Sequence, residues 1–226
     1  MAPTITAGHH AIVYVTGAAT AYTTATGAMT LAGDYKSATI TDAAKRIIYP
    51  IGAATVEEST DAGGSWHDYV ASAYILNRLT GTVTFPAART STYLYRIKVD
   101  GSWIALGQLL YAKEYALSMK KKLVDVTPFG VNAQVIVGGL GDANGTLGNF
   151  YGSAEVASLT LPAYFNVKLI AGTVFAIKFY VNANLSYLAW ALIDTEEMKP
   201  ALDGVIEQTV SWSGTPDSDG HVISRL

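Results

Sequence analysis

Apolar and polar residues alternate in several segments of the second half of the chain. Segment 93–99 has aromatic or aliphatic residues at its odd positions, with Arg96 and Lys98 between them. The same period of two recurs in three further segments, 111–120, 174–181 and 205–213. A period of two predicts β-strands that have one buried face and one polar face. Several such strands predict a mainly β fold whose layers pack as a β-sandwich or barrel.

One short helix is predicted between these strands. Leu161, Phe165 and Leu169 recur at helical spacing. Pro162 suits the first turn of a helix, and Gly172 suits its C-terminal stop. The expected fold is therefore a β-sandwich with a single flanking helix.

The N-terminal third has weaker patterns. Segment 16–33 consists mainly of small residues, and we expect either an extended arm or short edge strands there. A strand and one helical turn are predicted before Pro50, and a tight turn is predicted at Gly63 and Gly64. A further short strand should end at Pro86.

The pattern changes near residue 88, which predicts two parts. Residues 1–88 are expected to form a β-rich domain or an extended arm, and residues 89–226 a sandwich domain. The last segment, 214–226, is rich in turn residues. We expect it to be a mobile or exchanging tail.

Glycine recurs in segment 138–152, which invites comparison with nucleotide-binding loops. A P-loop would need a Gly-Lys-Ser or Gly-Lys-Thr ending, and the segment has none. Gly139, Gly141 and Gly145 are one residue off the dinucleotide-binding spacing, with no βαβ pattern around them. The glycines therefore predict a hairpin whose turn lies at residues 142–145.

The composition is apolar for a chain that must remain soluble on its own. Half of the 226 residues are hydrophobic and only 15% are charged. A large subunit interface would account for the low fraction of charged residues. The net charge of −3 argues against a surface that binds nucleic acid, and the absence of cysteine excludes disulfides. No signal peptide or membrane span is evident, so we expect assembly in a cytoplasm.

Candidate catalytic and metal-binding residues are sparse. The four histidines lack a recognised ligand spacing, and no GxSxG nucleophile elbow is present. The pairs Glu57–Glu58 and Glu196–Glu197 are adjacent residues, which we interpret as exposed loop charges. Segment 217–220 begins like a calcium loop, but no glutamate completes it, so a solvated turn is predicted. We expect a protein that is not an enzyme and has no cofactor or metal.

The aromatic residues leave a second class of function open. The chain has 14 tyrosines and 4 tryptophans. Such residues usually fill cores and subunit contacts, but they also line sugar-binding grooves. The alternative hypothesis is a virion carbohydrate- or receptor-binding module that uses exposed Trp66 or Trp103.

Five segments, in order, resemble the major tail tube proteins of long-tailed bacteriophages. They are Trp103–Leu106, Tyr115–Leu117 with Val124–Gly130, Gly139–Phe150, Leu169–Phe179 and Asp203–Gly214. The resemblance covers about residues 93–214, and residues before Ala88 depart from the compact pattern of the family.

The resemblance implies a structural virion protein of the phage tail. Subunits of that family form hexameric rings whose inner strands join into a barrel, and the rings stack into a tube through which DNA passes. The implied partners are other copies of the chain, other tail proteins and DNA that is not bound specifically, with no membrane. A mildly acidic chain suits such passage.

Residues around segments 111–120 and 131–137 are expected to form the inner barrel. Lys120, Lys121 and Lys122 are the only basic run, and we interpret them as edge protection or an inter-subunit ion pair. The predicted subunit-interface residues are Tyr111, Tyr115, Lys120, Lys122, Asp125, Phe129, Val135 and Val137.

Overall fold

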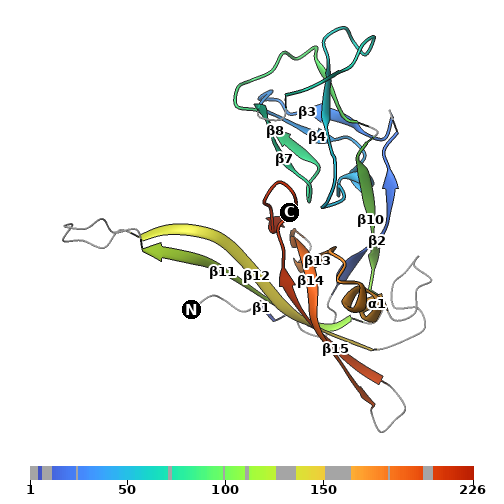
Figure 1. Ribbon diagram of the computed structural model, residues 1–226, viewed down its shortest axis with the longest axis vertical. Helices are drawn as coiled ribbons and strands as arrows, with labels where there is room; N and C mark the ends of the chain where they lie inside the picture. Colours follow the sequence, from blue (N-terminus) through green and yellow to red (C-terminus); the bar gives the residue numbers. More distant parts are fainter. Residues whose placement is uncertain are drawn as a thin grey trace, which may run out of the picture.

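The computed structural model has two β-sheets and, within its described residues, one α-helix (Figure 1). The described residues are 5–6, 12–23, 25–70, 73–98, 100–109, 112–125, 136–150, 164–182, 184–200 and 206–226. The prediction of a mainly β fold with one short flanking helix is confirmed.

The larger sheet has nine strands, and every pairing in it is antiparallel. Its order is β1-β11-β12-β15-β14-β13-β2-β10, and β16 pairs with β14 beside this path. The strands are β1 (Ile5–Thr6), β2 (Val13–Ala21), β10 (Ser102–Gln108), β11 (Ala112–Asp125), β12 (Ile136–Phe150), β13 (Phe175–Asn182), β14 (Leu185–Pro200), β15 (Ile206–Gly214) and β16 (Ile223–Arg225).

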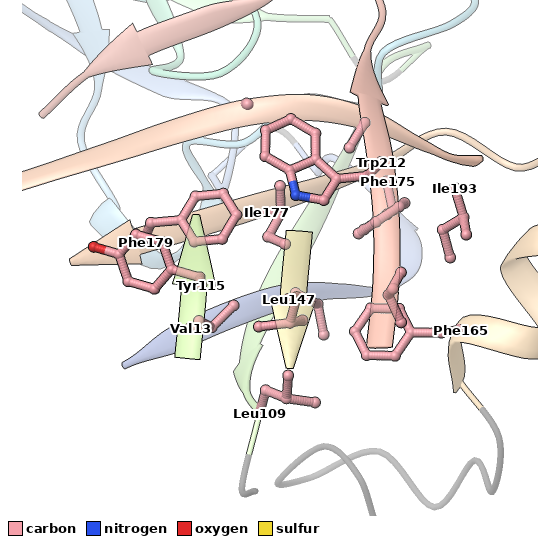
Figure 2. Packing of buried hydrophobic residues seen from close by; sticks show 14 of the residues in the cluster. Val13, Leu109, Tyr115, Leu147, Phe165, Phe175, Ile177, Phe179, Ile193 and Trp212 are labelled. Carbon is pink, nitrogen blue, oxygen red and sulfur yellow. The ribbon is translucent and has the colours of Figure 1, made fainter. Parts of the chain in front are cut away.

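This sheet curls so that its strands pack against one another as two layers. The first half of β14 pairs with β13 and the second half pairs with β15, with an irregularity between Ile193 and Thr195. Across the core, the rings of Tyr115 and Phe179 lie 4.7 Å apart, and Phe179 stacks on Trp212 at 5.5 Å (Figure 2). Since β13 is not a neighbour of β11 or β15 in the sheet, these contacts require the curl.

The helix α1 (Tyr164–Ala171) covers one end of this core. Phe165 is fully buried, and its ring lies 6.3 Å from that of Phe175. Gly172 follows the helix with φ +56°, which is the left-handed conformation expected at a helix stop. Gly172 therefore ends the helix as predicted, whereas Leu161 and Pro162 lie outside the described residues.

The smaller sheet has seven strands in the order β6-β5-β9-β3-β4-β8-β7. Its strands are β3 (Ala28–Leu31), β4 (Ser37–Ile40), β5 (Val56–Ser59), β6 (His67–Asp68), β7 (Ile75–Asn77), β8 (Thr82–Thr84) and β9 (Leu94–Ile97), and a 3-10 turn, η1, spans Ala43–Lys45. The predicted strand and turn before Pro50, the turn at Gly63 and the strand before Pro86 are confirmed. Tyr95 and Ile97 are buried, as the alternation in 93–99 predicts.

The smaller sheet is an insertion between two paired strands of the larger one. Strands β2 and β10 pair directly, with Ala21 opposite Ser102, and the backbone N–H of Tyr22 donates to Gly101 at 3.0 Å. The sheets consequently do not divide at residue 88, because β2 belongs to the larger sheet and β9 to the smaller. Of the two alternatives predicted for segment 16–33, strands are present and an extended arm is not, since this segment contributes to β2 and β3.

Three further expectations are corrected by the strands of the larger sheet. The glycine-rich segment is no hairpin turn, because β12 runs through it without interruption. Glu196 and Glu197 belong to strand β14 and not to a loop. The C-terminal segment contains a strand, β16, which pairs with Tyr187–Ala189 of β14, so the expectation of a mobile tail is also wrong.

Candidate functional site

Four strands of the larger sheet form an open surface with two outer edges. In the order β11-β12-β15-β14, residues pair in continuous rows across all four strands. Three rows on the face away from the core are Glu114–Gly148–Thr209–Glu197, Ala116–Thr146–Ser211–Thr195 and Ser118–Asn144–Ser213–Leu192. Strand β11 forms one edge of this surface and the second half of β14 forms the other.

The β11 edge is covered for only two residues. Strand β1 pairs with Ala116 and Leu117 of β11. Among the strands that the structure describes, the remainder of β11 has a neighbour on one side only, which is β12. Beyond the rows shared with β15, β11 and β12 continue together and project from the body as a long ribbon (Figure 1).

The second half of β14 has no strand partner on its outer side among the described residues, although α1 contacts this strand. Strand β13 pairs with β14 only as far as Ala191. From Leu192 to Pro200 the described pairings of β14 are with β15 alone. Three antiparallel steps separate the two edges, so β11 and β14 run in opposite directions.

The surface between the edges carries small polar side chains. Its centre contains Ser118, Asn144, Thr146, Ser211 and Ser213, which alternate with the core residues of the same strands. They line a shallow groove of about 360 Å³ together with Asp194, whose carboxylate accepts a hydrogen bond from Ser213 Oγ at 2.7 Å. Hydroxyl and amide groups give this surface hydrogen-bonding capacity with little charge at its centre.

The two edges differ in charge. Lys120 is exposed on β11, and Lys121 and Lys122 follow it in the sequence. On β14, Asp194 and Glu197 are exposed. Glu114 on β11 and Lys199 on β14 are exposed as well, so among the described side chains one edge is slightly basic and the other is acidic on balance.

Several of the charged groups near these edges already have partners within the chain. Glu197 lies 3.2 Å from Lys199 in an exposed ion pair. Lys113 of β11 donates to Glu207 of β15 at 2.9 Å, and this hydrogen bond raises the pKa of Lys113 above its ordinary value. Both pairs are well exposed, so they contribute little to stability.

Glu196 is half-buried beside the acidic edge. Its Oε1 accepts a hydrogen bond from Gln208 Nε2 at 2.6 Å. Its Oε2 is buried and has no hydrogen-bond partner among the described residues. A buried carboxylate oxygen without a partner is costly, and a donor from outside the chain would relieve that cost.

The predicted interface residues lie at different places in this surface. Tyr115 is only 1% exposed and belongs to the core, where its hydroxyl donates to the carbonyl of Tyr180 at 2.8 Å. Lys120 lies exposed on the β11 edge. The backbones of Lys122, Asp125 and Val137 lie in the projecting ribbon.

The remaining predicted residues, Tyr111, Phe129 and Val135, are outside the described residues. A role in subunit contact stays a prediction for the whole set. The sequence analysis did not identify the acidic edge, although the run Asp194 to Glu197 contains three acids in four residues, which is a usable signal.

The tryptophans of the alternative hypothesis are engaged within the chain. The guanidinium of Arg96 lies 4.1 Å from the ring centroid of Trp66, and Arg96 Nε also donates to Glu57 at 2.6 Å. Trp103 packs against the core of the smaller sheet, with Lys45 Nζ 5.8 Å from its ring centroid. Neither ring is presented alone on an open surface.

Metal and membrane sites were sought in the described part of the chain. It contains no group of three or more His, Asp or Glu side chains that could hold a metal ion. None of its helices has the length and apolar character needed to cross a bilayer. His67 is exposed on β6, and His9 and His10 lie outside the described residues.

Comparison with known proteins gives only distant likenesses. No family model and no curated protein matches the chain. Among solved structures, a chain from the tail of an empty gene transfer agent particle, refined helically with C6 symmetry, is 12% identical, with a TM-score of 0.42. A chain from the virion of the native gene transfer agent particle is 11% identical, also at 0.42. Each alignment covers 54% of this chain, and 87% and 88% of the other chain respectively. At this level of similarity neither structure assigns a function.

Proposed function

We propose that this chain is a structural subunit of a phage-like tail. Copies join side by side into rings, six to a ring, and the rings stack into a tube that encloses DNA. The subunit performs no catalysis. The observation that carries the proposal is the four-stranded surface β11-β12-β15-β14, in which the second half of β14 has no strand on its outer side and β11 is covered only at Ala116 and Leu117, by β1.

Open strand edges favour pairing with another chain. Each edge has backbone N–H and C=O groups that lack a strand partner among the described residues. In the ring, β11 of one copy pairs with the second half of β14 in the next copy. The two edges differ, so the contact is heterologous, and a heterologous contact closes into a ring when its rotation allows.

The directions of the two edge strands support this arrangement. Rotation about an axis that runs along the strands leaves the direction of each strand unchanged. Because β11 and β14 run in opposite directions within one copy, β11 of the neighbour is antiparallel to β14. The join then repeats the antiparallel pairing that is present throughout the larger sheet.

Charge supports the same join. The basic edge contains Lys120, and the acidic edge contains Asp194 and Glu197. Lys120 and Glu197 both belong to the face that points away from the core. Because Glu114 shares a row with Glu197 and Lys120 lies six residues further along β11, these charges meet when neighbouring copies are staggered along the strands, as the strands of a barrel are. Opposite charges on facing edges favour the head-to-tail contact and disfavour contact between two identical edges.

The polar face of these strands is suited to line the tube. Its central serines, threonines and asparagine hydrate well and carry no positive charge to hold phosphate groups. With a net charge of −3, the subunit has no overall attraction for DNA. DNA would then pass along this surface without being retained.

The test is a pair of charge reversals, Lys120→Glu and Glu197→Lys. Each variant alone places side chains of like charge at positions 120 and 197 of every join, so we expect neither to form rings. In an equal mixture the two variants alternate around the ring, and every join again has opposite charges. We therefore expect the mixture to form rings in electron micrographs, with an association constant for each join at least about tenfold above that of either variant alone, a difference of about 1.4 kcal/mol per join.

Lys36→Glu is the matched control, because Lys36 is also exposed but lies in the turn between β3 and β4 of the smaller sheet. It should assemble like the unmodified chain. Rings from either single edge variant would rule out the proposed pairing of β11 with β14. An unmodified chain that never assembles would rule out the tube function itself.

A further inference from the structure

The last twelve residues of the chain lie between the two sheets (Figure 1). Residues 215–226 leave β15, form a turn at 217–220 and return as β16 along β14. The turn contacts the smaller sheet and β16 contacts the larger one. We infer that this segment, here called the clasp, fixes the orientation of the inserted sheet and that its release lets the inserted sheet move as a separate body.

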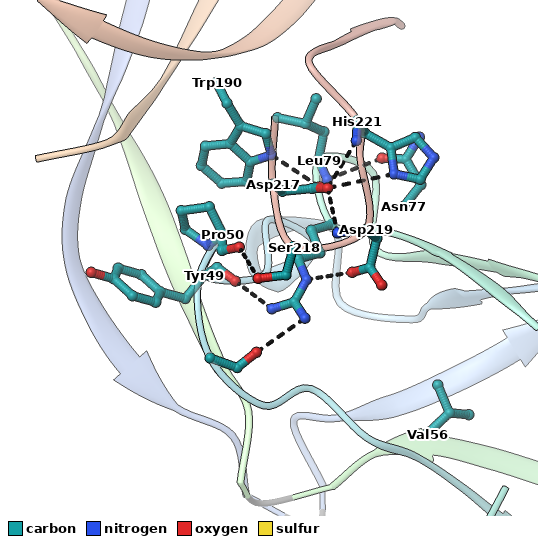
Figure 3. Close-up of polar contacts among 12 residues, drawn as sticks. Tyr49, Pro50, Val56, Asn77, Leu79, Trp190, Asp217, Ser218, Asp219 and His221 are labelled. Carbon is teal, nitrogen blue, oxygen red and sulfur yellow. Dashed lines mark hydrogen bonds and ion pairs between the residues drawn. The ribbon is translucent and has the colours of Figure 1, made fainter. Parts of the chain in front are cut away.

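Asp217 organises the turn of the clasp. Its side chain is fully buried, contrary to the predicted solvated turn. One carboxylate oxygen accepts hydrogen bonds from the backbone N–H groups of Asp219 and His221, each at 2.9 Å. The other accepts from the indole N–H of Trp190 at 3.2 Å, which ties the turn to β14 (Figure 3).

Asp219 extends from this turn to the inserted sheet. Its carboxylate accepts a hydrogen bond from Arg78 Nε at 2.5 Å. Arg78 is only 5% exposed, and its other nitrogens donate to the carbonyls of Tyr49 at 2.9 Å and Gly52 at 3.1 Å. The guanidinium therefore links the turn between β7 and β8, which contains Arg78, to the loop that contains Tyr49 and Gly52, and it joins both to the clasp (Figure 3).

Two more contacts cross between the same parts. Both the backbone N–H and the hydroxyl of Ser218 donate to the carbonyl of Pro50 at 3.0 Å. Asn77 Nδ2 donates to the hydroxyl of Ser224 at 3.1 Å. The clasp thus contacts the inserted sheet through backbone and side-chain groups at both of its ends.

Apolar packing between the sheets is limited. One small cluster spans the junction, and it consists of Ile47, Leu79, Ile104, Ala176, Leu188 and Trp190. Beside it lies a cavity of about 490 Å³, lined by residues of both sheets and by Leu226 of the clasp. Apart from the clasp, the inserted sheet is connected through the adjacent chain ends at Tyr22 and Gly101 and through β10, where the N–H of Tyr49 donates to the carbonyl of Ser102 at 2.7 Å and the N–H of Ile104 donates to the carbonyl of Ile47 at 2.8 Å. Trp103 of β10 also packs against the core of the inserted sheet. These contacts of β10 lie within three residues of Gly101 in the sequence, beside the chain ends, and this geometry suits a hinge.

The test measures the distance between the two sheets with a pair of spin labels. The chain has no cysteine, so Lys36→Cys on the inserted sheet and Val167→Cys on α1 provide the only two labelling sites. Both positions are exposed. The labelled chain is diluted with unlabelled chain, so that distances between copies do not contribute.

Asp219→Ala is the clasp variant, because Asp219 is partly exposed and its carboxylate contacts the inserted sheet. We expect the distribution of distances to broaden at least about twofold in this variant. Asp219→Glu retains the charge and should restore most of the narrow distribution. Asp68→Ala is the matched control, since it removes an exposed ion pair with Lys98 that lies wholly within the inserted sheet.

A distribution of distances in Asp219→Ala that is as narrow as in the unmodified chain would overturn the inferred role of the clasp. Equal broadening in Asp68→Ala would overturn it as well, because the motion would then follow from general loosening of the inserted sheet. Neither result depends on whether the chain assembles into rings.

Discussion

Replacing Trp212 with alanine is expected to lower the free energy of unfolding by about 3–5 kcal/mol, the usual range for a buried tryptophan. Trp212 is 1% exposed on β15 and stacks on Phe179 of the opposing layer. Its removal leaves a cavity at the point where the curled sheet packs against itself. Urea denaturation followed by circular dichroism measures the loss.

Trp66→Ala is the control for this prediction. Trp66 is half-buried on the smaller sheet, where its ring contacts Arg96. We expect this substitution to lower the free energy of unfolding by about 1 kcal/mol, the typical value for a partly exposed site. Equal losses in the two variants would contradict the placement of Trp212 at the centre of the larger core.

Replacing Gly145 with alanine is expected to separate β11 from β12. A Cβ atom at this position would overlap the carbonyl oxygen of Ala116 and stand 2.9 Å from the ring of Trp212. Since backbone atoms cannot yield as a side chain does, we expect a loss of about 3 kcal/mol in the free energy of unfolding. Hydrogen exchange along β11 and β12 should quicken in the same variant.

Gly33→Ala is the matched control, because a Cβ atom there meets nothing within 4 Å. It should change the free energy of unfolding by less than about 0.5 kcal/mol. A neutral Gly145→Ala variant would mean that the two strands do not approach as closely as the structure places them.

Strands with one buried and one polar face were predictable from the sequence. In β15, Val210 and Trp212 are buried in the core, whereas Thr209 and Ser211 on the opposite face are not buried. The helix was predictable for a related reason, because its spacing and Gly172 are local signals. Local periodicity is preserved wherever a single face meets the core.

Strand β14 was not predicted, because its first half is buried on both faces. Ala189 and Ala191 belong to the core of the larger sheet, whereas Leu188 and Trp190 pack toward the inserted sheet. A strand covered on both sides reads as a continuous apolar run without alternation. Its acidic second half was then interpreted as a loop.

Strand β2 and the glycines of β12 were misread for a different reason. The small residues of β2 gave no pattern, yet this strand lies between β13 and β10 and is paired on both sides. In β12, Gly145 is required by the close approach of Ala116 and Trp212 and not by a turn. Both cases depend on neighbours that are distant in sequence, so local reasoning could not reveal them.

Only one of the two edges of the candidate site could be predicted from the sequence. Lys120 was assigned to an edge from the basic run alone, and it lies exposed on β11. The acidic partner edge could not be assigned, because it required β14 to be recognised as a strand. The clasp was missed because Asp217 is buried by Trp190, a contact between residues 27 positions apart.

Electron microscopy of the purified chain, at a series of rising concentrations, tests the central claim most directly. We expect rings at intermediate concentration and stacked tubes at high concentration, each with a central channel. Discrete compact particles at every concentration, with a sedimentation coefficient that does not change, would contradict the account.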